Sequence, residues 1–145
     1  AQDDCADIVV FDYYLEWQKV NKKVVHNFDP DKIKYLDLVL SAQTENFVVN
    51  KLIRKSLYTD NGILHTQGLN FGEDYLVVPK LLFYSKKIVK VNEAFYHYVR
   101  FNDNSYTSSI SKKNIENCSR INSNNFIKFN YKCRSTQKYS TKKGN

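Results

Sequence analysis

The sequence has little of several residues whose abundance marks special classes of protein. It contains no Met, two Pro and four Gly among 145 residues, and no tract rich in Gly or Pro, which excludes a collagen-like or low-complexity chain. No apolar run approaches the roughly 20 residues that cross a bilayer, and residues 1–4 lack the basic and apolar parts of a secretion signal. Because a complete gene product begins with Met, we expect this chain to be processed or excerpted.

Cysteine is also scarce. Cys5, Cys118 and Cys133 are odd in number, far apart and without CxxC spacing, which indicates neither a disulfide framework nor a zinc site. The sequence therefore favours reduced thiols and a cytoplasmic location, and we assign no metal ligand within it.

Apolar and aromatic residues are plentiful, at 42% and 14%, which suffices for the core of one ordinary domain. The net charge of +7 is distributed unevenly. Residues 1–111 carry 13 basic and 14 acidic side chains, a net charge of −1, whereas residues 112–145 carry nine basic and one acidic, a net charge of +8. An anionic partner is therefore expected at the tail, and the balanced body argues against a nucleic-acid-binding domain.

The first half of the chain predicts a strand, an extended segment and a helix. The β-branched and aromatic run over residues 7–14 is typical of a buried strand, and residues 19–28 continue with extended character. Asp29 suits the N-cap and Pro30 the first position of a helix over residues 31–41.

The second half predicts two more units and a tail. Residues 47–49 have an extended pattern, and residues 52–58 the pattern of a brief helix. A helix over residues 73–86 and a strand over residues 88–101 follow, and apolar residues recur at helical spacing over residues 115–129. The predicted class is α/β, with a mixed sheet flanked by helices and a C-terminal helical basic tail.

Four segments occur in the order and spacing found in one enzyme family. They are Asn50-Lys51-Leu52-Ile53-Arg54-Lys55, the Glu73-Asp74 pair that ends a loop, the strand of residues 89–98 with Arg100 behind it, and Ser105-Tyr106-Thr107. These segments resemble the C-terminal half of bacterial family 2 glycosyltransferases, and the likeness runs over residues 6–111. The sequence departs from the family at Val49, where the family often has Trp, so one aromatic wall of the acceptor cleft is expected to be absent.

The resemblance implies a partial GT-A, Rossmann-like fold for residues 1–111, followed by the tail of residues 112–145. It implies transfer of a sugar, with inversion, from a nucleotide-diphosphate sugar to a saccharide or lipid-linked acceptor in cell-surface polysaccharide or lipopolysaccharide synthesis. In the family an N-terminal half ending in Asp-x-Asp binds the donor with Mg²⁺ or Mn²⁺, and that half is expected before residue 1. Asp29-Pro30-Asp31 has the same spelling but lies downstream of the expected place, so we assign it to helix capping.

Inverting sugar transfer needs a base that takes the proton from the acceptor hydroxyl as its oxygen attacks the anomeric carbon. In the resembled family the Asp of the Glu-Asp pair has this role, which makes Asp74 the expected base and Glu73 a residue that positions the acceptor or its loop. A helix dipole would keep such a carboxylate ionised. The alternative is that both residues cap the helix that begins there, an ordinary use of acids in a first turn.

Six further residues are candidates for substrate contact: Asn50, Lys51, Gly72, Arg100, Ser105 and Thr107. Gly72 would let the backbone approach a ligand closely. Asn50 and Lys51 would hold the acceptor loop or reach a phosphate, and Arg100 would meet the donor diphosphate. Each has a structural alternative, as a turn residue, the end of a strand or part of a solvated loop.

Two other classes of function stay open. The same half-fold could serve as a non-catalytic saccharide-binding module, and a pI of about 9.2 with interleaved aromatic residues also occurs in nucleic-acid-binding domains. The tail could lie on an anionic membrane, at the inner face of the plasma membrane, or pack against sequence outside this chain. Strands that lack partners would leave open edges, which makes self-association an expectation.

Overall fold

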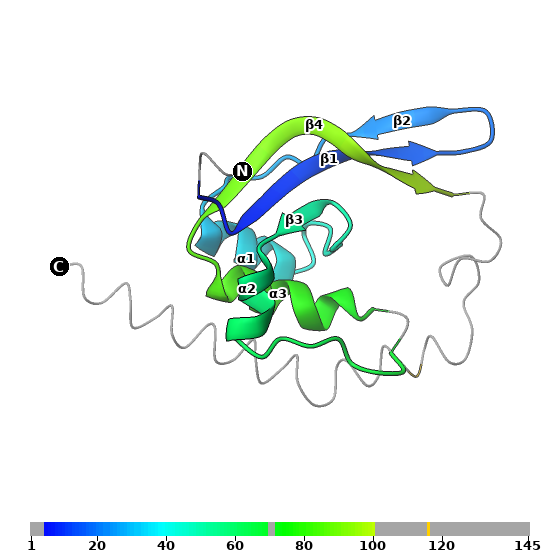
Figure 1. Ribbon diagram of the computed structural model, residues 1–145. Coiled ribbons are helices and arrows are strands. Elements are labelled where there is room, and N and C mark those ends of the chain that lie inside the picture. Colours follow the sequence, from blue (N-terminus) through cyan, green and yellow to red (C-terminus); the bar gives the residue numbers. More distant parts are fainter. Residues whose placement is uncertain (1–4, 70–71, 101–115, 117–145) are drawn as a thin grey trace.

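The computed structural model describes residues 5–69, 72–100 and 116, and these residues form one sheet with helices packed against it (Figure 1). The central strand β1 (Ile8–Glu16) runs parallel to β4 (Ile88–Val99). On its other edge β1 pairs antiparallel with β2 (Asn21–Val24) near its end and with β3 (Lys51–Ile53) near its start. The predicted α/β class, with a mixed sheet flanked by helices, is confirmed.

The helices α1 (Lys32–Leu40), α2 (Lys55–Asp60) and α3 (Asp74–Tyr84) lie together on one face of the sheet (Figure 1). The core forms between the two layers, where apolar side chains from both are almost fully buried: Ile8, Val10, Leu36, Val39, Val77, Val78, Leu81, Leu82 and Ile88. The strands over residues 7–14 and 88–101 and the helices over residues 31–41 and 73–86 were therefore predicted correctly, apart from their ends.

The start of α1 differs from the prediction, because Asp31 and not Asp29 caps it. Asp31 has a non-helical ψ of 120°, and its carboxylate accepts hydrogen bonds from the N–H groups of Ile33 at 3.0 Å and Lys34 at 2.9 Å. Asp29 instead accepts from the N–H of Asp31 at 3.0 Å, which orders the segment that enters the helix. Pro30 lies before the cap and so is not the first helical residue.

The predicted strand over residues 47–49 is wrong, because this segment is irregular and turns at Val49 and Asn50. The N–H of Lys51 donates to the carbonyl of Val48 at 3.0 Å and closes the turn, and we call the segment from Phe47 to Asn50 the 47–50 turn. The strand follows it as β3, and α2 begins three residues later than predicted, at Lys55. The apolar residues favour a strand, but the hydrogen bond from the N–H of Val48 to the distant Asp74 favours the turn.

Helix α3 ends at Tyr84, two residues before the predicted end. Ser85 takes an extended conformation, and the Asp7 carboxylate accepts the N–H of Lys86 at 2.7 Å. The ammonium of Lys32 on α1 donates to the carbonyls of Phe83 at 3.0 Å and Ser85 at 2.9 Å, groups that no longer have a partner within the helix.

The predicted tail helix over residues 115–129, with the basic tail of residues 112–145, lies outside the described residues, as do Ser105 and Thr107. Within the described part, none of the helices is long and apolar enough to cross a membrane.

Candidate functional site

Asp74 is the first residue of α3, and its carboxylate reaches across to another segment. Oδ2 accepts a hydrogen bond from the N–H of Val48 in the 47–50 turn at 3.2 Å. Glu73, at the N-cap position, makes no capping bond with its side chain. Within the described residues neither carboxylate makes a capping bond to α3, and no hydrogen bond reaches Oδ1 of Asp74.

The surroundings of Asp74 make it a stronger base than an ordinary aspartate. Burial raises the pKa of Asp74 above its usual value; the hydrogen bond from Val48 lowers it, the neighbouring Glu73 raises it, and Lys51 lowers it again. The net effect of these influences is a raised pKa, so burial outweighs the groups that lower it. A carboxylate with a higher pKa accepts a proton from a hydroxyl group more readily.

The turn that Asp74 holds is held from the other side by Lys51. This side chain is 8% exposed, and its ammonium donates to the Phe47 carbonyl and to Oδ1 of Asn50, the latter at 2.8 Å. Burial lowers the pKa of Lys51 to about 7, although Asp74 and Glu45 act in the opposite direction. Of the roles expected for Asn50 and Lys51, the structure shows them holding the loop, with the ammonium directed at protein oxygens.

Buried amide groups without partners lie at both ends of the 47–50 turn. Within the described residues, Nδ2 of Asn50 and both polar atoms of the Asn46 side chain make no hydrogen bond, and the two residues are 0% and 3% exposed. An unpaired buried polar group costs roughly 1–3 kcal/mol. Such groups are uncommon in native proteins, and Asp12 and His26 also carry such atoms.

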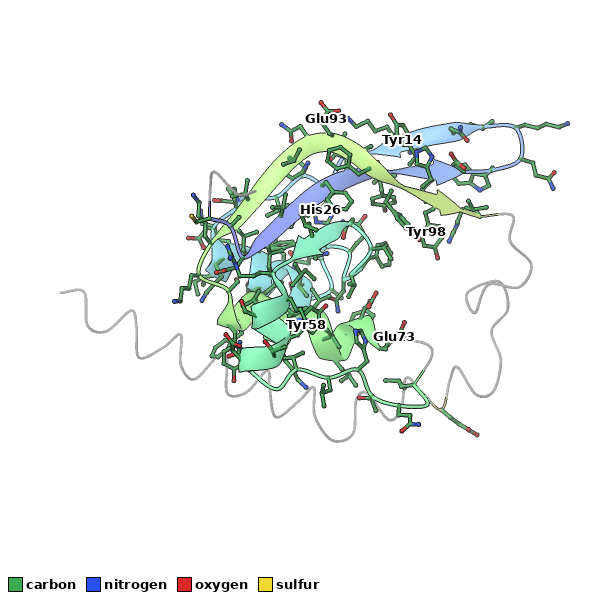
Figure 2. The ribbon with its side chains drawn as sticks, viewed as in Figure 1. Tyr14, His26, Tyr58, Glu73, Glu93 and Tyr98 are labelled. Atoms are coloured by element: carbon green, nitrogen blue, oxygen red, sulfur yellow. The ribbon has the colours of Figure 1, made fainter. Side chains whose placement is uncertain are left out.

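Aromatic rings extend the site from the turn to the ends of β1 and β4. The Phe47 ring is stacked against Tyr98 of β4 at 6.2 Å and lies edge-on to Tyr13 of β1 at 6.3 Å. The guanidinium of Arg100 lies 5.6 Å over the Tyr98 ring. Figure 2 shows Tyr98 below the end of β4, on the side of the sheet where the helices lie, and Glu73 at the start of α3. A series of contacts therefore runs from Asp74 through the 47–50 turn and the Tyr98 ring to Arg100.

Glu45 is a residue that sequence reasoning missed. Its Oε1 lies 3.5 Å from the Tyr13 hydroxyl, which donates to it, and its Oε2 lies 3.2 Å from Nδ1 of His26. It stands in a polar loop, and no spacing in the sequence distinguishes it from its neighbours. His26 also gave no signal, although it is 2% exposed. Both belong to the site only through long-range contacts.

Gly72 precedes α3 with φ of +76°, in the left-handed region that favours glycine. It lets the chain turn into the helix and brings Glu73 and Asp74 to the helix start.

No group of three or more His, Cys, Asp or Glu residues in the described part of the chain is arranged to hold a metal ion. We assign Mg²⁺ or Mn²⁺ no ligand among these residues.

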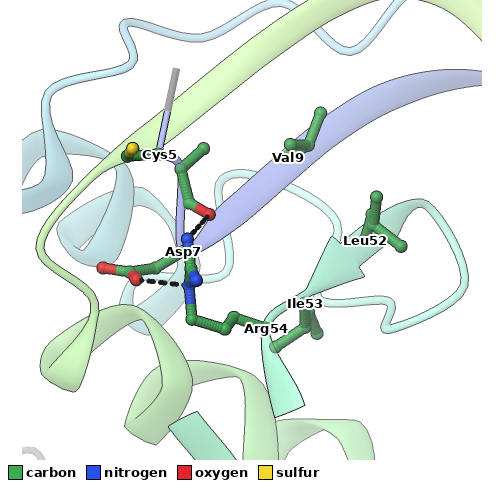
Figure 3. A pocket seen from close by; sticks show the side chains of 7 residues that line it. Cys5, Asp7, Val9, Leu52, Ile53 and Arg54 are labelled. Atoms are coloured by element: carbon green, nitrogen blue, oxygen red, sulfur yellow. Dashed lines mark hydrogen bonds and ion pairs between the residues drawn. The ribbon is translucent and has the colours of Figure 1, made fainter. Parts of the chain in front are cut away.

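A shallow pocket of about 390 Å³ lies where β1 meets β3 (Figure 3). Its charged groups satisfy each other, because Nε of Arg54 lies 3.1 Å from Oδ1 of Asp7 and the guanidinium also donates to the Ala6 carbonyl at 3.1 Å. Val9 and Leu52 supply apolar lining. None of the predicted site residues lines this pocket, so it is separate from the candidate site.

No protein-family model, curated protein or solved structure matches this chain. The likeness to family 2 glycosyltransferases therefore stays a prediction that rests on the sequence segments.

Proposed function

We propose that this chain supplies the acceptor side of an inverting glycosyltransferase of the GT-A type, with Asp74 as its catalytic base. The observation that carries the proposal is the state of the Asp74 carboxylate. One oxygen is fixed by the 47–50 turn at 3.2 Å, the other accepts no hydrogen bond from the described residues, and burial raises the pKa. A carboxylate that served only as an N-cap would bond to N–H groups of the first turn, whereas Oδ2 of Asp74 bonds to the 47–50 turn.

In the proposed reaction an acceptor hydroxyl gives its proton to Oδ1 of Asp74. Its oxygen forms a bond to the anomeric carbon of the donor sugar from the face opposite the diphosphate. The bond between that carbon and the diphosphate oxygen breaks, and the nucleoside diphosphate leaves with the electron pair. The configuration at the anomeric carbon is inverted, and the proton resides on Asp74 until solvent removes it.

The other candidates have supporting roles in this proposal. Glu73 orients the acceptor beside Asp74, Asn50 and Lys51 keep the turn in place, and Gly72 sets the approach of the loop. Arg100 stabilises the negative charge of the departing diphosphate, since a guanidinium pairs well with phosphate oxygens. Ser105 and Thr107, outside the described residues, are proposed to assist Arg100.

The donor is a nucleotide-diphosphate sugar, bound mainly by a half that the resembled family places before these residues. The divalent metal, Mg²⁺ or Mn²⁺, would belong to that half. The acceptor is a saccharide or lipid-linked saccharide, in the cytoplasm at the inner face of the plasma membrane, where the basic tail would contact anionic lipid. Synthesis of cell-surface polysaccharide is the process that these substrates indicate.

The test is release of nucleoside diphosphate by the natural polypeptide that carries these residues. We expect release from at least one common nucleotide sugar, UDP-, GDP- or dTDP-linked, and we expect a saccharide acceptor to stimulate it. A polypeptide that binds saccharides but releases no nucleoside diphosphate from any of these donors would exclude the enzyme and favour the non-catalytic saccharide-binding module.

A further inference from the structure

The rings of Phe47, Tyr98 and Tyr13 form a continuous cluster beside the 47–50 turn, which we call the aromatic platform. Phe47 contacts both tyrosine rings, with centroid distances of 6.2 Å to Tyr98 and 6.3 Å to Tyr13. Tyr13 is 5% exposed and supports the platform from within, whereas Phe47 and Tyr98 are half-buried. Because the Arg100 guanidinium lies over the Tyr98 ring, Phe47 is the ring of the platform that a ligand would meet.

The Glu45 carboxylate lies at the edge of the aromatic platform, since the hydroxyl of Tyr13 donates to it at 3.5 Å. Its side chain is 38% exposed, so it is accessible to a ligand as well. A hydrogen bond from Thr44 at 3.4 Å adds to its orientation. The platform therefore combines an apolar surface with a hydrogen-bond acceptor of fixed position.

Two buried side chains, Tyr35 and His26, lie in sequence behind the Glu45 carboxylate. The Tyr35 hydroxyl lies 3.2 Å from Nε2 of His26. Burial, with Lys51, lowers the pKa of His26 to about 4, so the ring is neutral at physiological pH. Nδ1 of the ring lies 3.2 Å from Oε2 of Glu45, without hydrogen-bond alignment.

We infer that the aromatic platform binds a pyranose ring of the acceptor saccharide, with Glu45 accepting hydrogen bonds from its hydroxyl groups. A pyranose has an apolar face of C–H groups and a rim of hydroxyl donors, which match the rings and the carboxylate respectively. The acceptor role of this saccharide rests on the proposed function, whereas saccharide binding itself does not.

The position of the platform relative to Asp74 fits this role. Phe47 and Val48 are consecutive residues, and Val48 is the residue whose N–H the Asp74 carboxylate accepts at 3.2 Å. A sugar stacked on Phe47 would therefore have its hydroxyl groups beside the 47–50 turn, which fixes the Asp74 carboxylate. The platform would select the acceptor and orient one of its hydroxyl groups, and proton transfer would remain with Asp74.

The experiment is saturation-transfer NMR of the 145-residue chain with methyl glycosides of glucose, galactose, mannose, N-acetylglucosamine and rhamnose, followed by titration of each ligand that responds. Phe47→Leu keeps an apolar side chain but removes the ring, and we expect it to weaken binding roughly five- to tenfold. Phe95→Leu is the matched control, because Phe95 is 65% exposed and its ring contacts Phe11 outside the platform. Glu45→Gln should also weaken binding.

Thermal unfolding of each variant shows whether it has folded. Equal binding by Phe47→Leu and the parent, or an equal loss in Phe95→Leu, would overturn the platform, and so would the absence of binding to every glycoside tested. In the natural polypeptide, acceptor-stimulated nucleotide release with an unchanged acceptor KM in Phe47→Leu would overturn the platform and leave the proposed function standing. Binding that depends on Phe47 without any nucleotide release would overturn the proposed function alone.

Discussion

Lys51 gives a sharp physical test of the site, because the residue is 8% exposed and its ammonium donates to two protein oxygens. Burial lowers the pKa of Lys51 from 10.5 to about 7. A difference of that size corresponds to a penalty of about 5 kcal/mol for the charged form in the folded state. Asp74 and Glu45 act against burial, so the carboxylate of Asp74 stabilises the ammonium.

The penalty makes folding stability depend on pH in a defined direction. Below about pH 7 the folded and unfolded states both hold the Lys51 proton, and the full penalty applies. Between about 7 and 10.5 the unfolded chain holds more protons than the folded one, so the free energy of unfolding rises with pH. Lys51→Met removes the titrating group, and the difference between this variant and the parent isolates its contribution.

The direct assay is an NMR titration of the lysine side chains labelled at Cε. We expect one lysine, assigned through Lys51→Met, to titrate at about 7. Asp74→Asn removes a carboxylate that raises this pKa, so Lys51 should titrate at a still lower pH in that variant, whereas Asp37→Asn, which changes an exposed residue of α1, should have no effect. A Lys51 that titrates near 10.5, or that does not respond to Asp74→Asn, would refute the reasoning.

Two stability predictions concern the frame of the site. Asp12→Asn should lower the free energy of unfolding by about 3 kcal/mol, because it takes the anion from Lys90, whose side chain is 13% exposed. Burial raises the pKa of Asp12, but hydrogen bonds from Lys90 and from a backbone N–H outweigh it, so the pKa lies below 3.8. The stabilisation is complete above 3.8 and disappears as the pH falls through the lower folded pKa, which chemical denaturation at several pH values measures, with the exposed Asp37→Asn as control. Equal stability of Asp12→Asn and the parent at neutral pH would contradict this prediction. Leu82→Ala changes a residue of 0% exposure and should lower the free energy of unfolding by about 3 kcal/mol through the cavity it leaves. Leu64→Ala changes a residue of 80% exposure and should leave the thermal midpoint nearly unchanged. Similar effects of the two variants would contradict the assigned core.

The long elements were predictable from the sequence because their patterns are strong over many residues. The strand at residues 7–14 and the helix at residues 73–86 carry apolar residues that pack into one core, so local preference and tertiary packing agree. The 47–50 turn was not predictable. Its apolar residues favour a strand, and the groups that bend it come from Asp74, 26 residues away from Val48, and from the buried Lys51.

The residues of the candidate site also divide into those that the sequence indicates and those that only the fold brings together. The Glu73-Asp74 pair could be chosen from the sequence because it lies between two segments that resemble the family. Glu45 could not, since the groups that orient it, Tyr13 and His26, are brought to it only by the fold. Side chains fixed by residues distant in sequence leave no periodic trace, and a structure is needed to find them.

The most direct test of the account is the sugar-transfer rate of Asp74→Asn in the natural polypeptide, measured beside Asp37→Asn. An asparagine at this position can still accept the Val48 N–H, which now lies 3.2 Å from Oδ2, but it cannot take a proton from the acceptor hydroxyl. We predict that kcat falls at least about 100-fold in Asp74→Asn, while the thermal midpoint and the KM for the nucleotide sugar change little. A turnover by folded Asp74→Asn within about threefold of the parent would contradict the assignment of Asp74 as the base.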